Sequence, residues 1–146
     1  MEQNIYVKKF NELNNDELYQ ILDLRSRVFI MEQNCLYQDI DGKDMHSIHY
    51  FIKDDKKIIS YLRLIDPGIR YPEYALSRIV SDPKYRSFGY ATLLIKKALS
   101  DIKGESVRIS GQAYLKEYYE SLGFKVVHGP YLEDDIPHYE MFHPNV

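Results

Sequence analysis

The sequence predicts an α/β fold in which one mixed β-sheet is flanked by helices, and two observations carry this prediction. In the second half of the chain, strand-like and helix-like segments alternate, which is typical of parallel strands joined by crossover helices. In the first half, two strand-like runs flank the polar turn 54–56, which favours an antiparallel hairpin. The chain has no internal repeat, low-complexity tract or shift in composition, so one domain over 1–146 is expected.

The elements of the first half follow from local patterns. Strands are expected over 5–10, 49–53 and 57–65. Asn14 offers a helix cap, and apolar residues at helical spacing predict a helix that runs to Phe29. A second short helix over 30–36 extends it, and the acidic segment 36–44 is expected to form an ordered loop.

In the second half, prolines and glycines mark the boundaries. Strands are expected over 74–81, 106–110 and 124–128, and helices over 89–102 and 114–122. Pro83 stops the first of these strands, because proline has no N–H to continue a hydrogen-bonded ladder. Gly123 closes the last helix as its C-cap.

Composition excludes several classes of function. The chain has 45% apolar and 28% charged residues, as ordinary globular proteins do, and its net charge of -3 offers no basic field for nucleic acid or anionic lipid. The single cysteine, Cys35, allows neither an internal disulfide nor a thiolate zinc cluster. No long apolar stretch predicts a signal peptide or a membrane span. We therefore expect a cytoplasmic protein without a metal. His46 and His49 straddle a loop-to-strand boundary and do not suggest a metal site.

The segment 86–91 carries the strongest functional signal. It follows the strand-like run 75–80 and opens the helix-like run 92–99, with Gly89 at the junction. A strand, a tight turn and a helix start direct several free main-chain N–H groups at one point, where they can hold a phosphate. The alternative is a tight strand-to-helix junction with no ligand. The context favours a site for a phosphate-bearing cofactor.

These residues also resemble a known family. The string from Ile79 to Ala91 looks like the acetyl-CoA motif of the GNAT superfamily N-acetyltransferases, and the string from Tyr118 to Phe124 resembles the signature near the end of the same fold. Three further stretches are similar to the ElaA-like branch of that superfamily, namely 24–35, 39–44 and 131–138. The likeness covers nearly all of the chain.

The resemblance implies a GNAT fold that uses acetyl-CoA as co-substrate. Main-chain groups that pair with the pantetheine arm are expected at Ile79, Val80 and Ser81. N–H groups that bind the pyrophosphate are expected at Arg86, Ser87, Phe88, Gly89, Tyr90 and Ala91. Ser87 and Ala91 stand where many relatives carry glycine, which the loop tolerates if φ is negative at both positions.

The implied reaction is direct attack of a primary amine, of a small molecule or a peptide, on the thioester in a ternary complex. An acid must protonate the departing thiolate, and Tyr119 matches the position of that acid in relatives. Tyr118 and simple core packing are the alternatives. A base must take the amine proton, and the candidates are Glu32, Asp41, His49, Glu133 and His138, with Glu32 and His138 as first choices for the base or the acceptor side.

Three further expectations remain open at this point. Carboxylates in segments that flank the acceptor side of similar proteins predict either an acidic mouth for a cationic amine or ordinary polar loops, at Glu32, Asp39, Asp41, Asp44, Glu133, Asp134 and Asp135. Cys35 is expected to be buried as a small apolar residue rather than to act as a nucleophile. A non-catalytic acyl-CoA-binding module is the rival function, and a homodimer is compatible with the sequence.

Overall fold

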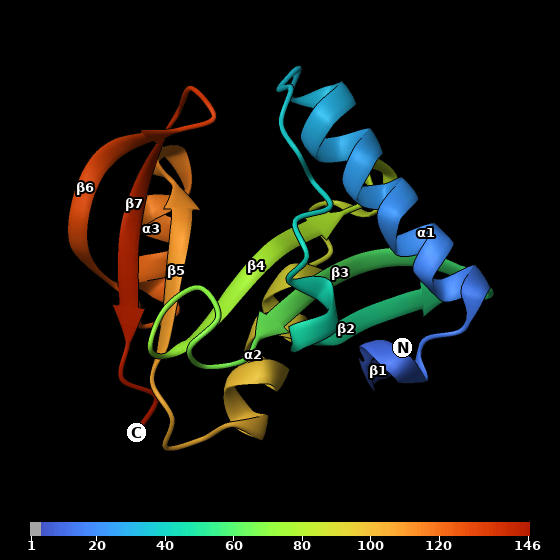
Figure 1. Ribbon diagram of the computed structural model, residues 1–146, viewed down its shortest axis with the longest axis horizontal. Coiled ribbons are helices and arrows are strands. Elements are labelled where there is room, and N and C mark those ends of the chain that lie inside the picture. The colour runs from blue at the N-terminus through green and yellow to red at the C-terminus, as the bar shows by residue number, and fades with distance from the viewer. Residues whose placement is uncertain (1–3) are drawn as a thin grey trace.

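A seven-stranded mixed sheet, in the order β1-β2-β3-β4-β5-β7-β6, runs through the protein (Figure 1). The computed structural model describes residues 4–146. The strands are β1 Ile5–Lys9, β2 Ser47–Asp54, β3 Lys57–Ile65, β4 Tyr74–Ser81, β5 Val107–Gln112, β6 Lys125–Glu133 and β7 Ile136–His143. The helices are α1 Asn15–Arg25, α2 Tyr90–Asp101 and α3 Lys116–Ser121. The predicted α/β class and the hairpin of β2 and β3 are confirmed.

Helix α1 begins with a reciprocal cap. The Asn14 side chain accepts the Glu17 N–H at 2.8 Å, and the Glu17 carboxylate accepts the Asn14 N–H at 3.1 Å. After Arg25 the chain does not continue as an α-helix to Phe29 with a short helix over 30–36. It widens instead into a π-helical segment, Ser26–Glu32. Apolar spacing over seven residues does not distinguish these two backbone windings, so the sequence pattern missed the change.

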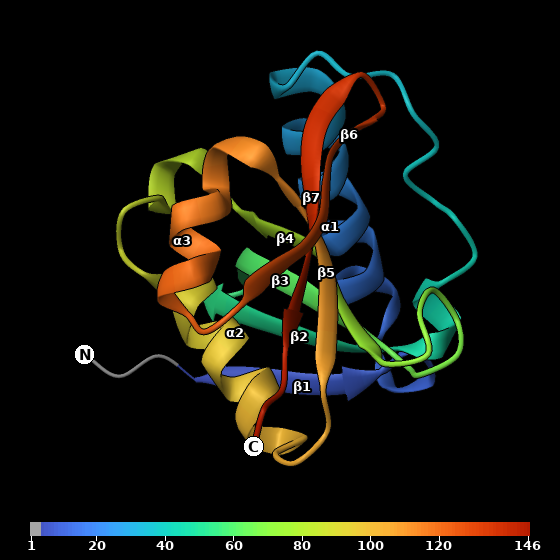
Figure 2. The same cartoon turned by 90° about the vertical axis from the view of Figure 1, so that its left-hand side faces the viewer.

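Each face of the sheet carries its own apolar core. On one face, Ile21 and Leu24 of α1 pack with Phe51 and Tyr61 of the sheet. On the other face, α2 and α3 complete the larger core, and Figure 2 shows these two helices on the left of the view and α1 on the right, partly behind β5 and β7. Burial of both faces explains why β3 is apolar almost throughout, with eight of its nine residues buried.

Strands β4 and β5 diverge soon after they pair. Their parallel register holds only at Tyr74 with Val107 and at Ala75 with Arg108, and beyond it the strands separate (Figure 1). On its other side, β4 pairs with β3 through a bulge at Arg78, whose φ is +54°. The second half of β4 therefore presents an edge that β5 does not cover.

The strand β7 was not predicted. The expected strand over 124–128 corresponds to β6, but β6 extends to Glu133, and β7 inserts between β5 and β6, antiparallel to both. Strands β5 and β6 run in the same direction, as the crossover helix between them predicted. They are not neighbours, however, because β7 lies between them. Pro137 and alternating polar residues weakened the strand signal over 136–143. This insertion places His138 opposite Gln112 of β5 and Tyr131 of β6.

Candidate active site

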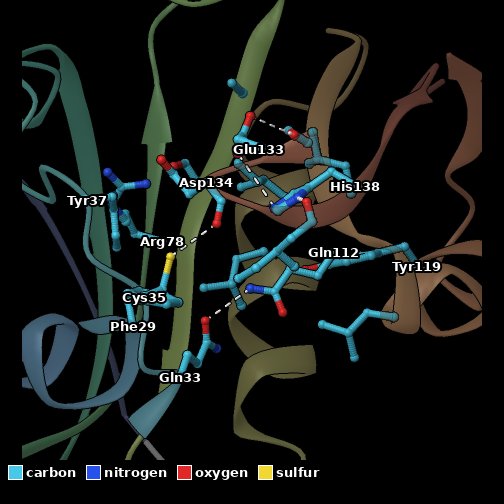
Figure 3. A pocket seen from close by; sticks show the side chains of 18 of the residues that line it. Phe29, Gln33, Cys35, Tyr37, Arg78, Gln112, Tyr119, Glu133, Asp134 and His138 are labelled. Atoms are coloured by element: carbon cyan, nitrogen blue, oxygen red, sulfur yellow. Dashed lines mark hydrogen bonds and ion pairs between the residues drawn. The ribbon is translucent and has the colours of Figure 1, made fainter. Parts of the chain in front are cut away.

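A cavity of about 160 Å³ occupies the space between the diverging strands β4 and β5 (Figure 3). The segment after the π-helix covers it with Gln33, Cys35 and Tyr37, and α3 contributes Tyr119. The hairpin between β6 and β7 closes the far side, with lining residues Glu133, Asp134, Ile136 and His138. The walls thus come from β4 and β5, from the ends of β6 and β7 with their turn, from α3 and from the covering segment, and the separation of β4 from β5 makes room for a ligand.

The segment 86–91 lies at the N-terminus of α2, as predicted. The first hydrogen bond inside the helix runs from Leu93 N–H to the Gly89 carbonyl, so the N–H groups of Tyr90, Ala91 and Thr92 have no partner within α2. Gly89 occupies the N-cap position with φ of +79° and has no side chain to cap the helix. The helix therefore presents open donors, and a partial positive charge, to an anion.

Ser87 corrects one detail of the sequence interpretation. Its φ is +71°, so the condition that the loop keeps a negative φ at both non-glycine positions fails at Ser87, whereas Ala91 lies within α2. Left-handed residues on both sides of Phe88 turn the loop sharply onto the helix. The physical reason is the tight turn itself, which needs left-handed residues although only one of them is glycine.

Glu32 does not line the cavity. Its carboxylate accepts two hydrogen bonds from the Arg86 guanidinium, at 2.5 and 2.7 Å, and these bonds lower the pKa of Glu32. Both side chains are partly exposed. Of the two first choices for the base, Glu32 is thus placed beside the α2 loop and only His138 lies in the cavity wall.

The two neighbouring tyrosines point in different directions. The Tyr118 hydroxyl hydrogen-bonds Thr92 Oγ1 on α2 at 2.6 Å. Tyr119 is 7% exposed and lines the cavity, and its hydroxyl forms no hydrogen bond with any of residues 4–146. Burial raises the pKa of Tyr119, so the phenol stays protonated. Its ring lies against Gly111 of β5, where an added Cβ would come within 2.9 Å of a ring carbon.

His138 lies in the cavity wall with one nitrogen fixed. Its Nδ1 is 2.6 Å from the Ile136 carbonyl, which can only accept, so the geometry assigns the proton of the neutral ring to Nδ1. Nε2 then carries the lone pair and lies 3.6 Å from a carboxylate oxygen of Glu133 (Figure 3). The ring is 7% exposed. A buried imidazole whose free lone pair borders a cavity can accept a proton.

Two other base candidates are engaged in structural contacts. His49 is buried in the core and hydrogen-bonds the Tyr61 hydroxyl at 2.6 Å and the Asp44 carbonyl at 2.9 Å, and burial lowers its pKa. Asp41 pairs with Arg63 at 2.6 Å, and its pKa is well below the ordinary value because Arg63 donates to it despite its partial burial. Neither side chain lines the cavity.

Of the two alternatives that the sequence left open for the carboxylates, the acidic mouth is wrong for the segment 36–44. Its three aspartates turn inward onto three arginines of α1, β3 and β4. The pairs are Arg25 with Asp39 and Asp44, Arg63 with Asp41 and Asp44, and Arg78 with Asp39 and Asp41. Glu133 also has a cationic partner, Arg70, at 2.8 Å. Within residues 4–146, only Asp134 and Asp135 of the predicted mouth lack an ion pair.

Sequence reasoning missed the arginines that neutralise this loop. Arg63 lies between two leucines in the interior of a mostly apolar strand, and Arg25 ends an amphipathic helix. A charged residue inside a buried strand requires a partner of opposite charge, and that requirement was the available signal. It would have redirected the loop carboxylates to the interior. The lining residues Arg70, Ser110 and Gln112 carried no comparable signal.

Cys35 is not packed in the core. Its side chain is partly exposed, lines the cavity and lies 3.4 Å from the Asp134 carbonyl, which it contacts as a weak donor. The expected burial is wrong because the helical segment ends at Glu32, so Cys35 lies beyond the helix and helical spacing does not place its side chain in the core. Desolvation and the nearby aspartates raise the pKa of the thiol, which is the opposite of what a thiolate nucleophile requires.

Among residues 4–146, no three His, Cys, Asp or Glu side chains come together in a way that could hold a metal ion. No helix in that same range has the length and apolar character needed to cross a bilayer.

Comparison with known proteins agrees with this geometry. The family model for the acetyltransferase (GNAT) domain matches residues 11–143. A UPF0039 protein of Synechocystis is 36% identical over 97% of this chain and 95% of its own, and Escherichia coli ElaA is 33% identical over 90% of both chains. The crystal structure of that ElaA superposes with a TM-score of 0.89, covering 97% of this chain and 99% of the other. An acyl-CoA N-acyltransferase from Pseudomonas aeruginosa gives a TM-score of 0.90 at 36% identity, covering 96% of this chain and 99% of the other. The predicted ElaA-like resemblance is confirmed, and the chain belongs to the GNAT acetyltransferase family.

Proposed function

We propose that the protein transfers an acetyl group from acetyl-CoA to a primary amine of a small molecule or peptide. This proposal rests on two structural features that lie next to each other along the chain. The loop after β4 leads to open N–H donors at the start of α2, and the uncovered edge of β4 borders a cavity that is lined by Tyr119 and His138. Membership of the GNAT family, and the likeness to an acyl-CoA N-acyltransferase, support the same reaction class.

In this proposal the co-substrate follows the chain from α2 to the cavity. The N–H groups over 86–91 bind its diphosphate, with the helix dipole adding attraction. The pantetheine arm pairs with main-chain groups of Ile79, Val80 and Ser81 on the edge that β5 leaves open. The thioester then reaches the space that Tyr119 and His138 border.

The proposed chemistry is one acyl transfer with two proton movements. The amine nitrogen attacks the thioester carbonyl carbon, and the carbon–sulfur bond breaks as the new amide forms. The Nε2 of His138 takes the proton that the amine loses, and Tyr119 donates its hydroxyl proton to the departing thiolate. Each proton transfer contributes about 10²–10⁴-fold to the rate. Glu32, which Arg86 engages, is assigned to the cofactor side instead.

Composition and charge support a proposal for the compartment and for the acceptor. One thiol without a disulfide partner suits a reducing compartment, and we place the reaction in the cytoplasm. Since Glu133 is paired with Arg70, the carboxylate available to a cationic amine is that of Asp134 at the cavity wall. The electrostatic attraction between the cavity and a cationic acceptor is therefore weaker than an acidic mouth of seven carboxylates would provide.

A thiol-release assay tests the proposal. Purified protein is incubated with acetyl-CoA and, separately, spermidine, glucosamine and a lysine peptide, and the acetylated amine is detected by mass spectrometry. Release of free CoA together with product is the expected result. Calorimetric binding of acetyl-CoA without release would support the rival, a non-catalytic binding module. Absence of binding would contradict both functions.

A further inference from the structure

Glu133 lies between Arg70 and His138 and faces each of them through a different carboxylate oxygen. Its Oε1 accepts from Arg70 Nη2 at 2.8 Å and from the Ser110 hydroxyl at 3.2 Å. Its Oε2 lies 3.6 Å from Nε2 of His138. The carboxylate is thus fixed on one side and, on the other, faces the one ring nitrogen that carries a lone pair.

We propose that Glu133 is a positioning residue for His138 and that Arg70, by holding Glu133, sets the pH range in which the transferase works. This inference rests on the proposed function, because it gives His138 the role of base. When Nε2 takes a proton from the amine, Glu133 faces the new positive charge and stabilises it. Arg70 competes for the same carboxylate and weakens that stabilisation.

The surroundings of the His138 ring distinguish Glu133 from the other charged groups of the cavity. The Tyr131 ring on β6 stacks on the His138 ring, and the other titratable or charged groups that line the cavity with His138 come from several elements: Asp134 in the turn after β6, Tyr119 on α3, Cys35 and Tyr37 on the covering segment, Tyr71 before β4, and Arg78 on β4. Arg78 is paired with Asp39 and Asp41. Among residues 4–146, Glu133 is the acidic group within ion-pair distance of the ring.

The proposal predicts opposite effects from two substitutions. In Glu133→Gln the protonated ring loses a neighbouring negative charge, so the acidic limb of kcat/KM against pH moves to lower pH. In Arg70→Gln the carboxylate loses its competing cation, so the acidic limb moves to higher pH. Each shift is expected to be about 0.5 to 1 pH unit, because Glu133 is partly exposed to solvent. A purely structural role would not produce shifts of opposite sign.

Titration of the His138 ring by nitrogen NMR supplies a second readout that needs no acceptor. At high pH the wild-type ring is expected to carry its proton on Nδ1, and the midpoint of its titration is expected to move down in Glu133→Gln and up in Arg70→Gln. Glu140→Gln is the matched control, since Glu140 lies on the same strand as His138 and its partner, Arg108, keeps a second carboxylate, Glu73. That control is expected to leave both profiles unchanged.

The outcomes separate the two proposals. If wild-type protein releases no CoA with any amine, the proposed function fails, and the NMR titration still decides the relation between Glu133, Arg70 and His138. If turnover is normal but the two substitutions shift the midpoints in the same direction, or no more than Glu140→Gln does, the positioning role is overturned. A proton on Nε2 of the neutral ring would overturn it as well.

Discussion

The adjacent residues Tyr118 and Tyr119 have different positions and contacts at this site. Successive residues on a helix point roughly 100° apart. On α3 this rotation directs Tyr118 to Thr92 and Tyr119 into the cavity. Gly111 makes the second placement possible, because any side chain there would collide with the Tyr119 ring. The hydroxyl that meets the thioester in the proposed reaction is therefore that of Tyr119.

Replacement of Tyr119 by phenylalanine tests this assignment. We expect Tyr119→Phe to lower kcat by about 10²-fold or more, because the departing thiolate loses its proton donor, and to leave the Kd for CoA unchanged. Steady-state kinetics and calorimetry give the two numbers. Tyr118→Phe is the control, since it removes only the contact with Thr92. Normal turnover in Tyr119→Phe would move the acid role to Tyr118 or to water.

The Glu32–Arg86 pair gives a second prediction at this scale. We expect Glu32→Gln to tighten CoA binding by about two- to fivefold, because an exposed pair of this kind is worth only about 0.2–1 kcal/mol and its loss frees Arg86 for the diphosphate. Calorimetry at two salt concentrations measures the effect, which shrinks at high salt. A collapse of kcat with unchanged CoA affinity would instead restore Glu32 as the base.

At the scale of elements, the loop into α2 depends on two left-handed residues. Gly89→Val places a β-branched residue at a φ of +79°, so the loop must change shape, and we expect CoA binding to be lost while the domain stays folded. Ser87→Gly relieves the strain at a φ of +71° and is expected to preserve binding. Calorimetry and thermal unfolding measure both variants. Intact binding in Gly89→Val would count against the diphosphate site.

Sequence patterns predicted those elements whose signals are local. The cap at Asn14, the proline that stops β4 and the glycine at the end of α3 each act on neighbouring residues, and the structure has all three features. The π-helical turn and β7 depend on distant contacts. Nothing in the residues 136–143 alone indicates that β5 and β6 stand far enough apart to accept a strand between them. His138 reaches the cavity only through that insertion.

Over the whole molecule, an ionic cluster joins parts of the chain that are remote in sequence. Arg25 of α1, Arg63 of β3 and Arg78 of β4 hold the three aspartates of the segment 36–44. The cluster fixes the loop from which Tyr37 reaches the cavity, and the Arg78 guanidinium lies over the Tyr37 ring at 5.1 Å. The sequence indicates that these carboxylates are candidates for function. It does not indicate whether they point to the solvent or to the interior, because that depends on buried arginines in other elements.

This cluster predicts how stability depends on pH. The pKa values of Asp41 and Asp44 lie below the unfolded value of 3.8, so both carboxylates bind protons more weakly in the folded state. Their contribution to the free energy of unfolding is therefore complete well above pH 3.8 and is lost as pH falls below it. We expect a steep loss of stability below about pH 4 in urea unfolding curves.

The substitution Asp41→Asn checks the source of that effect. It leaves the buried Arg63 with one carboxylate fewer, and we expect it to cost about 2–3 kcal/mol at neutral pH and to flatten the acid limb of the stability curve. Asp23→Asn, which removes an exposed carboxylate from α1, is the control and is expected to change little. An unchanged acid limb in Asp41→Asn would place the pH dependence elsewhere.

A crystal structure with acetyl-CoA bound tests the central claim most directly. We predict that main-chain N–H groups between Arg86 and Thr92 donate to the diphosphate, and that the thioester lies between Tyr119 and His138 in the cavity of β4 and β5. A co-substrate seated elsewhere, with the start of α2 left without a phosphate and the cavity without the thioester, would contradict the account.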